Sequence, residues 1–180
     1  MLTAQQKRKE NIAEYILYLY QVEDLIRALQ LNISNIETQL VSQYQVDDKT
    51  RQEIVIWYEN LVIMMEKEGI QAKGHFQFLS NLISELNEFH LKLMETGIDK
   101  EYVRMFQLIS GLITELNLKG NSVKNDIQIS LDAIYGFLLL KMQKKQITDK
   151  TTEAITRLSG WLSLLSKLFK DFESGDLVFE

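Results

Sequence analysis

The chain contains no proline, and this absence restricts its fold more than any other feature of the sequence. Proline ends or kinks helices because its ring removes a backbone N–H donor and clashes with the preceding turn. Only eight glycines interrupt the 180 residues, so long segments carry nothing that forces a helix to stop. Helix is therefore the expected structure along most of the chain.

The segment from Lys7 to Leu29 carries the clearest helical pattern. Apolar residues recur in it with alternating spacings of three and four, which places them on one side of an α-helix. This stripe consists of Ile12, Tyr15, Leu19, Val22, Ile26 and Leu29. Further apolar side chains flank the stripe, so the apolar surface is wider than a surface helix normally buries. We predict one continuous helix here, contacted by neighbours on more than one side.

Cap residues and further stripes divide the rest of the chain into six more predicted helices. A short one begins with the capping box of Ser34 and Glu37 and runs to about Gln43. The longer ones follow side chains that can cap a helix, or precede glycines that can end one. They run from Asp47 to Gly69 or Gly74, from His75 to Thr96 before Gly97, from Asp99 to Lys119, from Asn121 or Ser122 to Lys145, and from Thr148 to Phe172. Trp57 and Trp161 lie at core positions of two of these helices.

Short connections between helices favour neighbours that run antiparallel, and a helix of about 22 residues is about 33 Å long. The predicted fold is all-α: an up-and-down helical bundle of about six or seven helices. We expect a single domain over residues 1–180, with residues 173–180 as a frayed tail.

Two segments, 79–87 and 109–117, have similar sequences at a constant offset. This indicates either a duplicated helix, with Glu85 and Glu115 in equivalent positions, or two amphipathic helices built from the same few residue types. Two copies fall short of the three or more repeats that a solenoid needs. Both interpretations stay open.

Charge and composition narrow the classes of partner. Acidic residues exceed basic ones by 25 to 20, and the resulting net charge of −5 disfavours a nucleic-acid binder. The most apolar run, Ile134–Leu140, is far shorter than the roughly 20 residues needed to cross a bilayer, so no membrane partner is expected. No secretory signal follows the N-terminal basic residues. The lack of cysteine excludes disulfides and thiolate sites and fits a reducing compartment, so we expect a cytoplasmic protein.

The sequence offers no recognisable catalytic or metal site. A ferritin-like di-iron centre needs Glu-x-x-His on two helices, whereas the carboxylates before His90 are Glu85 and Glu88, at spacings of five and two. His90 and His75 both lie near an apolar stripe, so each is expected to be a core or boundary side chain held by a hydrogen bond. Neither a Gly-x-Ser-x-Gly elbow nor a glycine-rich phosphate loop occurs. No catalytic residue, cofactor or metal ligand is predicted.

The first predicted helix carries a mixed polar and apolar strip away from its stripe. Glu14, Tyr18 and Gln21 belong to it, and tyrosines and charged groups are buried together at many interfaces. The strip suits either a binding surface or a solvated face with boundary tyrosines. Glu23 and Arg27 on the same helix are spaced for an i,i+4 ion pair.

The basic cluster Lys7, Arg8 and Lys9 is predicted near a helix N-terminus, where the helix dipole disfavours cations. This mismatch indicates either an anionic partner or a solvated arm that precedes a helix beginning at Glu10.

The segment Gln6–Ala28, QKRKENIAEYILYLYQVEDLIRA, resembles the N-terminal signature of a bacterial family of unknown function, domain-of-unknown-function family 4924 (DUF4924). The resemblance extends over the full length of the chain. Members of that family are similar in size and occur mainly in Bacteroides-type gut bacteria, which implies a bacterial cytoplasmic origin. The family has no assigned activity, cofactor or catalytic residue, so the resemblance assigns no function to any position.

Three functions are compatible with the sequence. The first is a non-enzymatic helical scaffold or protein-interaction protein, which associates with itself as a homodimer through exposed stripe residues of the first or last helix. The second is a small-molecule binder or enzyme with an inter-helix pocket that uses Glu14, Tyr15, Tyr18 or His90 as polar groups. The third is polyanion contact through the basic N-terminal arm. The candidate interaction or pocket residues are Lys7, Arg8, Lys9, Glu14, Tyr15, Tyr18, Gln21 and His90.

Overall fold

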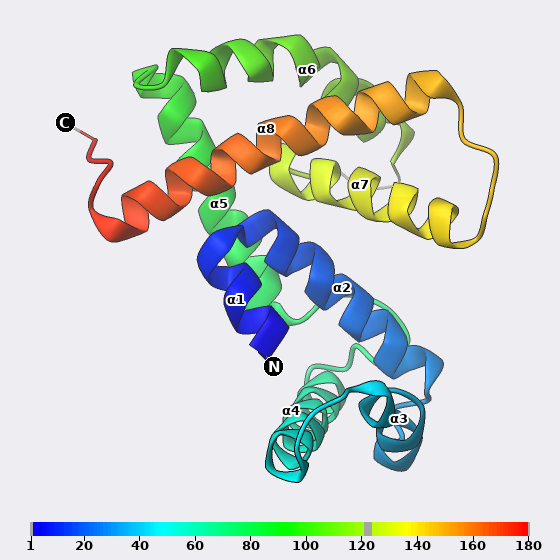
Figure 1. The fold of residues 1–180 in the computed structure, drawn as a ribbon. Helices are drawn as coiled ribbons and strands as arrows, with labels where there is room; N and C mark the ends of the chain where they lie inside the picture. The colour runs from blue at the N-terminus through cyan, green and yellow to red at the C-terminus, as the bar shows by residue number, and fades with distance from the viewer. Residues whose placement is uncertain (1, 121–123, 180) are drawn as a thin grey trace.

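The computed structural model describes residues 2–120 and 124–179, and every regular element in these two ranges is helical (Figure 1). The elements are α1 (Leu2–Glu10), α2 (Ile12–Ala28), α3 (Ile33–Gln39), the 3₁₀ turn η1 (Val41–Gln43), α4 (Asp48–Lys67), α5 (Gln77–Thr96), α6 (Lys100–Lys119), α7 (Asp126–Met142) and α8 (Asp149–Ser174). The predicted all-α class is confirmed. The helix count is slightly above the six or seven expected, because the first predicted helix is two helices.

The prediction of one continuous helix from Lys7 to Leu29 is wrong at Asn11. Asn11 has extended backbone angles (φ −153°, ψ 105°) and its side chain accepts a hydrogen bond from the backbone N–H of Glu14, so it caps α2. Helix α1 ends before it and packs against α2 and α8. The basic cluster of residues 7–9 therefore occupies the last turn of α1, where the helix dipole favours cations.

Most of the other predicted boundaries are confirmed. Asp47, Asp99 and Thr148 each accept the backbone N–H three residues on, and Gly97 ends α5 in the left-handed conformation with φ 61°. The capping box at Ser34 is wrong, because Asn32 caps α3 instead. Asn121 and Ser122 lie outside the described residues, and the side chain that caps α7 is that of Asn125.

Helix α8 lies at the centre of the arrangement. It crosses the molecule in Figure 1 and contacts α1, α2, α5, α6 and α7. Trp161, whose side chain is fully buried as predicted, lies near the middle of this helix. Helix α2 also has neighbours on several sides, namely α1, α7 and α8. The fold is thus built on α2 and α8, which between them contact α1, α5, α6 and α7.

The predicted apolar stripe of the first helix, and the similar stripe of the last helix at Ile155, Leu158, Leu162, Leu165, Phe169 and Phe172, are used inside the chain. Most of their residues are no more than 3% exposed: Ile12, Leu19, Val22 and Ile26 on α2, and Leu158, Leu162, Leu165 and Phe169 on α8. These side chains are therefore not available to a second molecule while the chain is folded. Of the remaining stripe residues, Tyr15, Leu29 and Ile155 are partly buried and Phe172 is 41% exposed, so little of either stripe is open to a second molecule.

Helices α3 and α4 pack on each other and project from the rest of the fold (Figure 1). The inward face of α4 contains Ile54, Tyr58, Leu61, Val62 and Met65. Trp57 packs against the core as predicted, but it is only partly buried, and its neighbour Tyr58 takes the fully buried position.

The chain after α8 turns back on the fold. Gly175 adopts the left-handed conformation (φ 83°), and the backbone N–H groups of Asp176 and Leu177 both donate to the carbonyl of Asp171. The ring of Phe179 packs 5.6 Å from that of Phe89 on α5. Across the described residues, none of the helices is both long enough and apolar enough to span a membrane.

Candidate functional site

An apolar groove runs along the surface between α6 and α8. We call it the α6–α8 groove. It consists of two adjoining hollows of about 330 and 200 Å³ that share Leu108, Ile109 and Arg157. The complete lining is Arg104, Met105, Leu108, Ile109, Leu112, Lys150, Glu153, Ala154 and Arg157. The floor is thus made of aliphatic side chains and the charged residues stand on its rim.

The groove exists because the two helices meet through small residues of α8. Ala154 contributes only a methyl group, and a Cβ placed on Gly160 would lie 3.4 Å from Cε of Met105. The core-facing residues of α6, such as Ile109, point inward, whereas Leu108 is 61% exposed on the open side. A large apolar side chain is therefore presented to solvent beside a surface that α8 does not fill.

Among the residues that line the groove, the cations outnumber the acids. Arg104, Lys150 and Arg157 line it against a single acid, Glu153, in a chain of net charge −5. Arg157 pairs with Glu153 at 2.6 Å, and Arg104 pairs with Glu101 at 2.6 Å, where its hydrogen bond lowers the pKa of the Glu101 carboxyl. Both pairs are solvent-exposed, and such pairs contribute little to stability. The arginines are consequently free to exchange these partners for carboxylates of another molecule.

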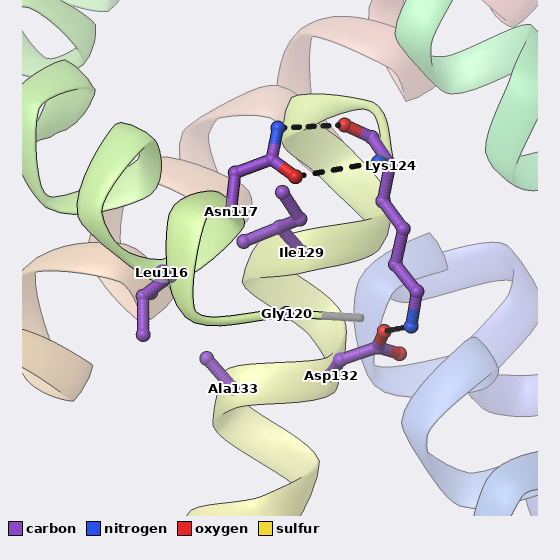
Figure 2. A pocket seen from close by; sticks show the side chains of 7 residues that line it. All are labelled: Leu116, Asn117, Gly120, Lys124, Ile129, Asp132 and Ala133. Atoms are coloured by element: carbon purple, nitrogen blue, oxygen red, sulfur yellow. Dashed lines mark hydrogen bonds and ion pairs between the residues drawn. The ribbon is translucent and has the colours of Figure 1, made fainter. Parts of the chain in front are cut away.

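A second depression, of about 410 Å³, lies between the end of α6 and α7 (Figure 2). It is lined by Leu116, Asn117, Gly120, Lys124, Ile129, Asp132 and Ala133. Figure 2 shows the Asn117 amide facing the backbone of Lys124, with hydrogen bonds of 3.3 and 3.4 Å, and the Lys124 ammonium reaching Asp132 at 2.6 Å. The pocket thus has an apolar floor and one ion pair on its wall.

A chain of hydrogen bonds leads from this pocket into the core. Gln128 donates to Asp132 at 2.7 Å and to the hydroxyl of Tyr20 at 3.1 Å. Tyr20 is 1% exposed, and burial raises the pKa of its hydroxyl, which therefore stays neutral. Its ring stacks on that of His75, with 3.8 Å between the centroids.

The His75 ring in turn contacts the carboxylate of Glu23. The side chain is fully buried, and it accepts the backbone N–H of Phe76 at 2.8 Å while lying 2.6 Å from Nδ1 of His75. The predicted i,i+4 pair between Glu23 and Arg27 is wrong. Arg27 instead pairs with Asp24 at 3.0 Å and donates to the carbonyls of two loop residues, Ile70 and Gly74. Together these contacts fix the loop between α4 and α5 to α2.

A carboxylate that orients an imidazole is also found in hydrolytic active sites, where the other ring nitrogen acts as the base. At Glu23 and His75 the imidazole ring is stacked on Tyr20, and the cavities described above are lined by other residues. The pair is best understood as a clasp between α2 and the loop.

His90 is a core histidine, as predicted. It is 1% exposed, its Nδ1 lies 2.7 Å from the hydroxyl of Tyr102, and its Nε2 lies 3.6 Å from Asp126. The rings of Phe106 and Trp161 surround it. Burial lowers the pKa of His90, against the opposing effect of Asp126. In the described ranges, no group of three or more His, Asp or Glu side chains is arranged to hold a metal ion.

The structure brings together four of the eight candidate residues named from the sequence. Lys7, Glu14, Tyr18 and Gln21 line a shallow hollow of about 170 Å³ with Leu17 and Leu138. Lys7 pairs with Glu14 at 2.8 Å, and burial raises the pKa of Tyr18 to about 12.

The other four candidates are not among the residues that line this hollow. Tyr15 is half-buried, Lys9 is exposed and His90 lies in the core. Arg8 binds the carboxylate of Glu173 through both terminal nitrogens, at 2.7 and 3.0 Å. The chain's own acids therefore already neutralise two of the three basic residues of the N-terminal cluster.

Sequence reasoning missed the α6–α8 groove and the clasp at Glu23. The groove had one visible signal, since Leu108 stands beside Ile109 and three residues after Met105, which widens the apolar stripe of α6. The clasp had none, because its partners are 52 residues apart in the chain.

Comparison with known proteins supplies a family and no activity. No curated protein and no solved structure matches the chain. The family model described as "Domain of unknown function (DUF4924)" matches residues 1–176, which is nearly the whole chain. This is the family that the segment Gln6–Ala28 already indicated. The protein therefore belongs to the DUF4924 family.

Proposed function

We propose that this protein is a non-enzymatic helical interaction protein of the bacterial cytoplasm, and that its α6–α8 groove binds an acidic, amphipathic helix of a protein partner. The observation that carries the proposal is Leu108, a large apolar side chain that is 61% exposed beside an unfilled aliphatic groove. Exposed apolar surface rimmed by charged residues is typical of protein interaction sites.

A helix suits the shape of the groove. The groove follows α6 from Arg104 to Leu112, which is about 12 Å, or two turns, at the rise of an α-helix. A partner helix with apolar residues three, four and seven positions apart would place them on the floor between the two helices. Covering a side chain such as Leu108 contributes about 1–2 kcal/mol, a useful part of a micromolar affinity.

The rim selects the charge of the partner. Arg104, Lys150 and Arg157 outnumber Glu153 among the lining residues, so an acidic helix is attracted and a basic one is repelled. Because these groups are solvent-exposed, added salt should weaken the attraction.

The test is binding of a synthetic helical peptide that carries leucines on one face and glutamates elsewhere, labelled with fluorescein and followed by fluorescence anisotropy. Leu108→Gln should weaken binding at least ~10-fold, because it removes the apolar contact at the centre of the groove. Leu118→Gln is the matched control, since Leu118 is on the same helix, is 82% exposed and lies outside the groove. Equal affinities for the two variants would contradict the proposal.

A second candidate function, ligand binding between α6 and α7, is favoured by the pocket in Figure 2. Its volume of about 410 Å³ falls within the range of small-molecule sites, and Lys124 provides a cation on its wall. A small apolar carboxylic acid would suit this combination. The test is an NMR titration with hexanoate. Saturable chemical-shift changes at Ile129 and Ala133 that are lost in Lys124→Ala would support ligand binding, and unchanged spectra would contradict it.

A further inference from the structure

We infer that the helix bound in the α6–α8 groove is α5 of a second copy of this chain. The inference rests on the proposed function, since it names the partner of the same groove. The other occupant, an acidic helix of an unrelated protein, is an outcome of the test below.

The outer face of α5 has the chemistry that the groove requires. Leu91 is 56% exposed at its centre, and the exposed residues Glu88 and Glu95 flank it at spacings of three and four. Residues so spaced lie on one face of a helix. We call these three residues the α5 ridge. Ile98, 45% exposed just beyond the helix end, extends the apolar surface.

The charge of this face is opposite to that of the groove. Helix α5 exposes three acids, Glu85, Glu88 and Glu95, and one cation, Lys92. The ammonium of Lys92 lies 4.5 Å from the centre of the Phe179 ring, so it is held towards the C-terminal tail. The ridge therefore presents a leucine between two carboxylates to a groove that presents aliphatic side chains between cations.

The two surfaces also match in length. The ridge from Glu88 to Glu95 covers about 10 Å of helix, against about 12 Å for the groove from Arg104 to Leu112. Each copy owns one ridge and one groove on different helices, and we place the two copies about a two-fold axis, so that both donate and receive at once. Two such contacts close the assembly as a dimer.

The experiment uses charge reversal and full-length protein. The groove variant carries Arg104→Glu and Arg157→Glu, and the ridge variant carries Glu88→Arg and Glu95→Arg. Sedimentation equilibrium over about 1–100 µM protein should show a dimer for the wild type and monomers for each variant, with dissociation constants raised at least ~10-fold. Each variant repels itself because both contacts of its homodimer then juxtapose like charges.

An equimolar mixture of the two variants should restore the dimer. In the mixed dimer, the reversed groove of one copy meets the reversed ridge of the other, and the second contact keeps the native charges on both sides. A merely destabilised variant would not be rescued in this way, so rescue separates a direct contact from damage to the fold. Glu59→Arg with Glu66→Arg is the matched control, because these acids are exposed on α4 at the same spacing as Glu88 and Glu95. This control should remain a dimer.

A monomeric wild type at the highest concentration would overturn the inference, as would an unrescued mixture. The peptide-binding experiment tests the proposed function separately from the dimer. If the wild type is monomeric and the glutamate-rich peptide still binds in a manner that Leu108→Gln abolishes, the groove is a docking site for another protein. If the peptide fails to bind and the mixture is not rescued, both conclusions fall.

Discussion

The fully buried carboxylate of Glu23 lies 2.6 Å from Nδ1 of His75, and this contact joins α2 to the loop that precedes α5. The same carboxylate accepts the backbone N–H of Phe76, itself fully buried. Removing it leaves the backbone N–H of Phe76 without an acceptor in the core and takes the partner of the partly exposed His75 ring away. A buried unsatisfied group costs about 1–3 kcal/mol.

We therefore expect Glu23→Ala to lower the free energy of unfolding by about 2–4 kcal/mol, since it also leaves a cavity. Glu23→Gln should cost less, because the amide oxygen can still accept one of the two hydrogen bonds. Urea denaturation followed by circular dichroism measures both. Glu85→Ala, at an exposed position, serves as the control. A change for Glu23→Ala no larger than for this control would contradict the clasp.

The burial of His90 makes stability depend on pH. Burial holds the folded-state pKa of His90 below its ordinary value of 6.5, so the unfolded chain binds the proton more readily. The stabilising contribution is complete above about pH 6.5 and is lost as the pH falls through the lowered folded-state pKa. Urea denaturation at a series of pH values should show the unfolding free energy falling below about pH 6.5.

The variant His90→Asn should flatten that slope, although it lowers stability at neutral pH by removing packing against Trp161. Denaturation of His75→Asn over the same pH series controls for the other histidine. A slope in His90→Asn as steep as in the wild type would assign the effect to other groups.

The break at Asn11 is a helix cap, and its loss should be measurable. Asn11→Ala removes the acceptor for the backbone N–H of Glu14 and is expected to cost about 1 kcal/mol of stability. Thermal unfolding checks this directly. Asn60→Ala, at an exposed position inside α4, should be neutral or slightly stabilising because alanine has the higher helix propensity. The changes in unfolding free energy caused by the two substitutions should thus differ by about 1 kcal/mol.

Two glycines offer a second matched pair. Gly97 has φ 61°, so Gly97→Ala forces alanine into the left-handed region and should destabilise by about 1 kcal/mol. Gly111 lies inside α6 with open space around the position of a Cβ, so Gly111→Ala should stabilise by about 0.5–1 kcal/mol. Opposite shifts of the unfolding midpoint are expected, and shifts of the same sign would refute the assignment of Gly97 as a cap.

The local features of this fold could be predicted from the sequence. Caps such as Asp99 and Thr148 were identified because a capping side chain acts on a backbone group only three residues away. The break at Asn11 was predictable on the same grounds, since Asn11 and Glu14 have the spacing of a cap and its partner, yet the strong apolar stripe around them favoured a continuous helix. In the prediction, the apolar stripe of residues 12–29 therefore outweighed the capping side chain of Asn11.

The candidate site could be predicted only in part. Lys7, Glu14, Tyr18 and Gln21 share a hollow because they lie close together in sequence. The α6–α8 groove depends instead on how two distant helices approach, and the exposure of Leu108 follows from where α8 stops covering α6. Periodicity shows which face of a helix is apolar, and it does not show how much of that face a neighbour covers.

The central position of α8 has a consequence for synthesis in the cell. This helix, residues 149–174, leaves the ribosome after the five helices that pack against it. Until it emerges, the surfaces that receive Trp161 and Phe169 stay open to water. The native core therefore closes only after α8 has emerged, and chaperones have access to the nascent chain until then.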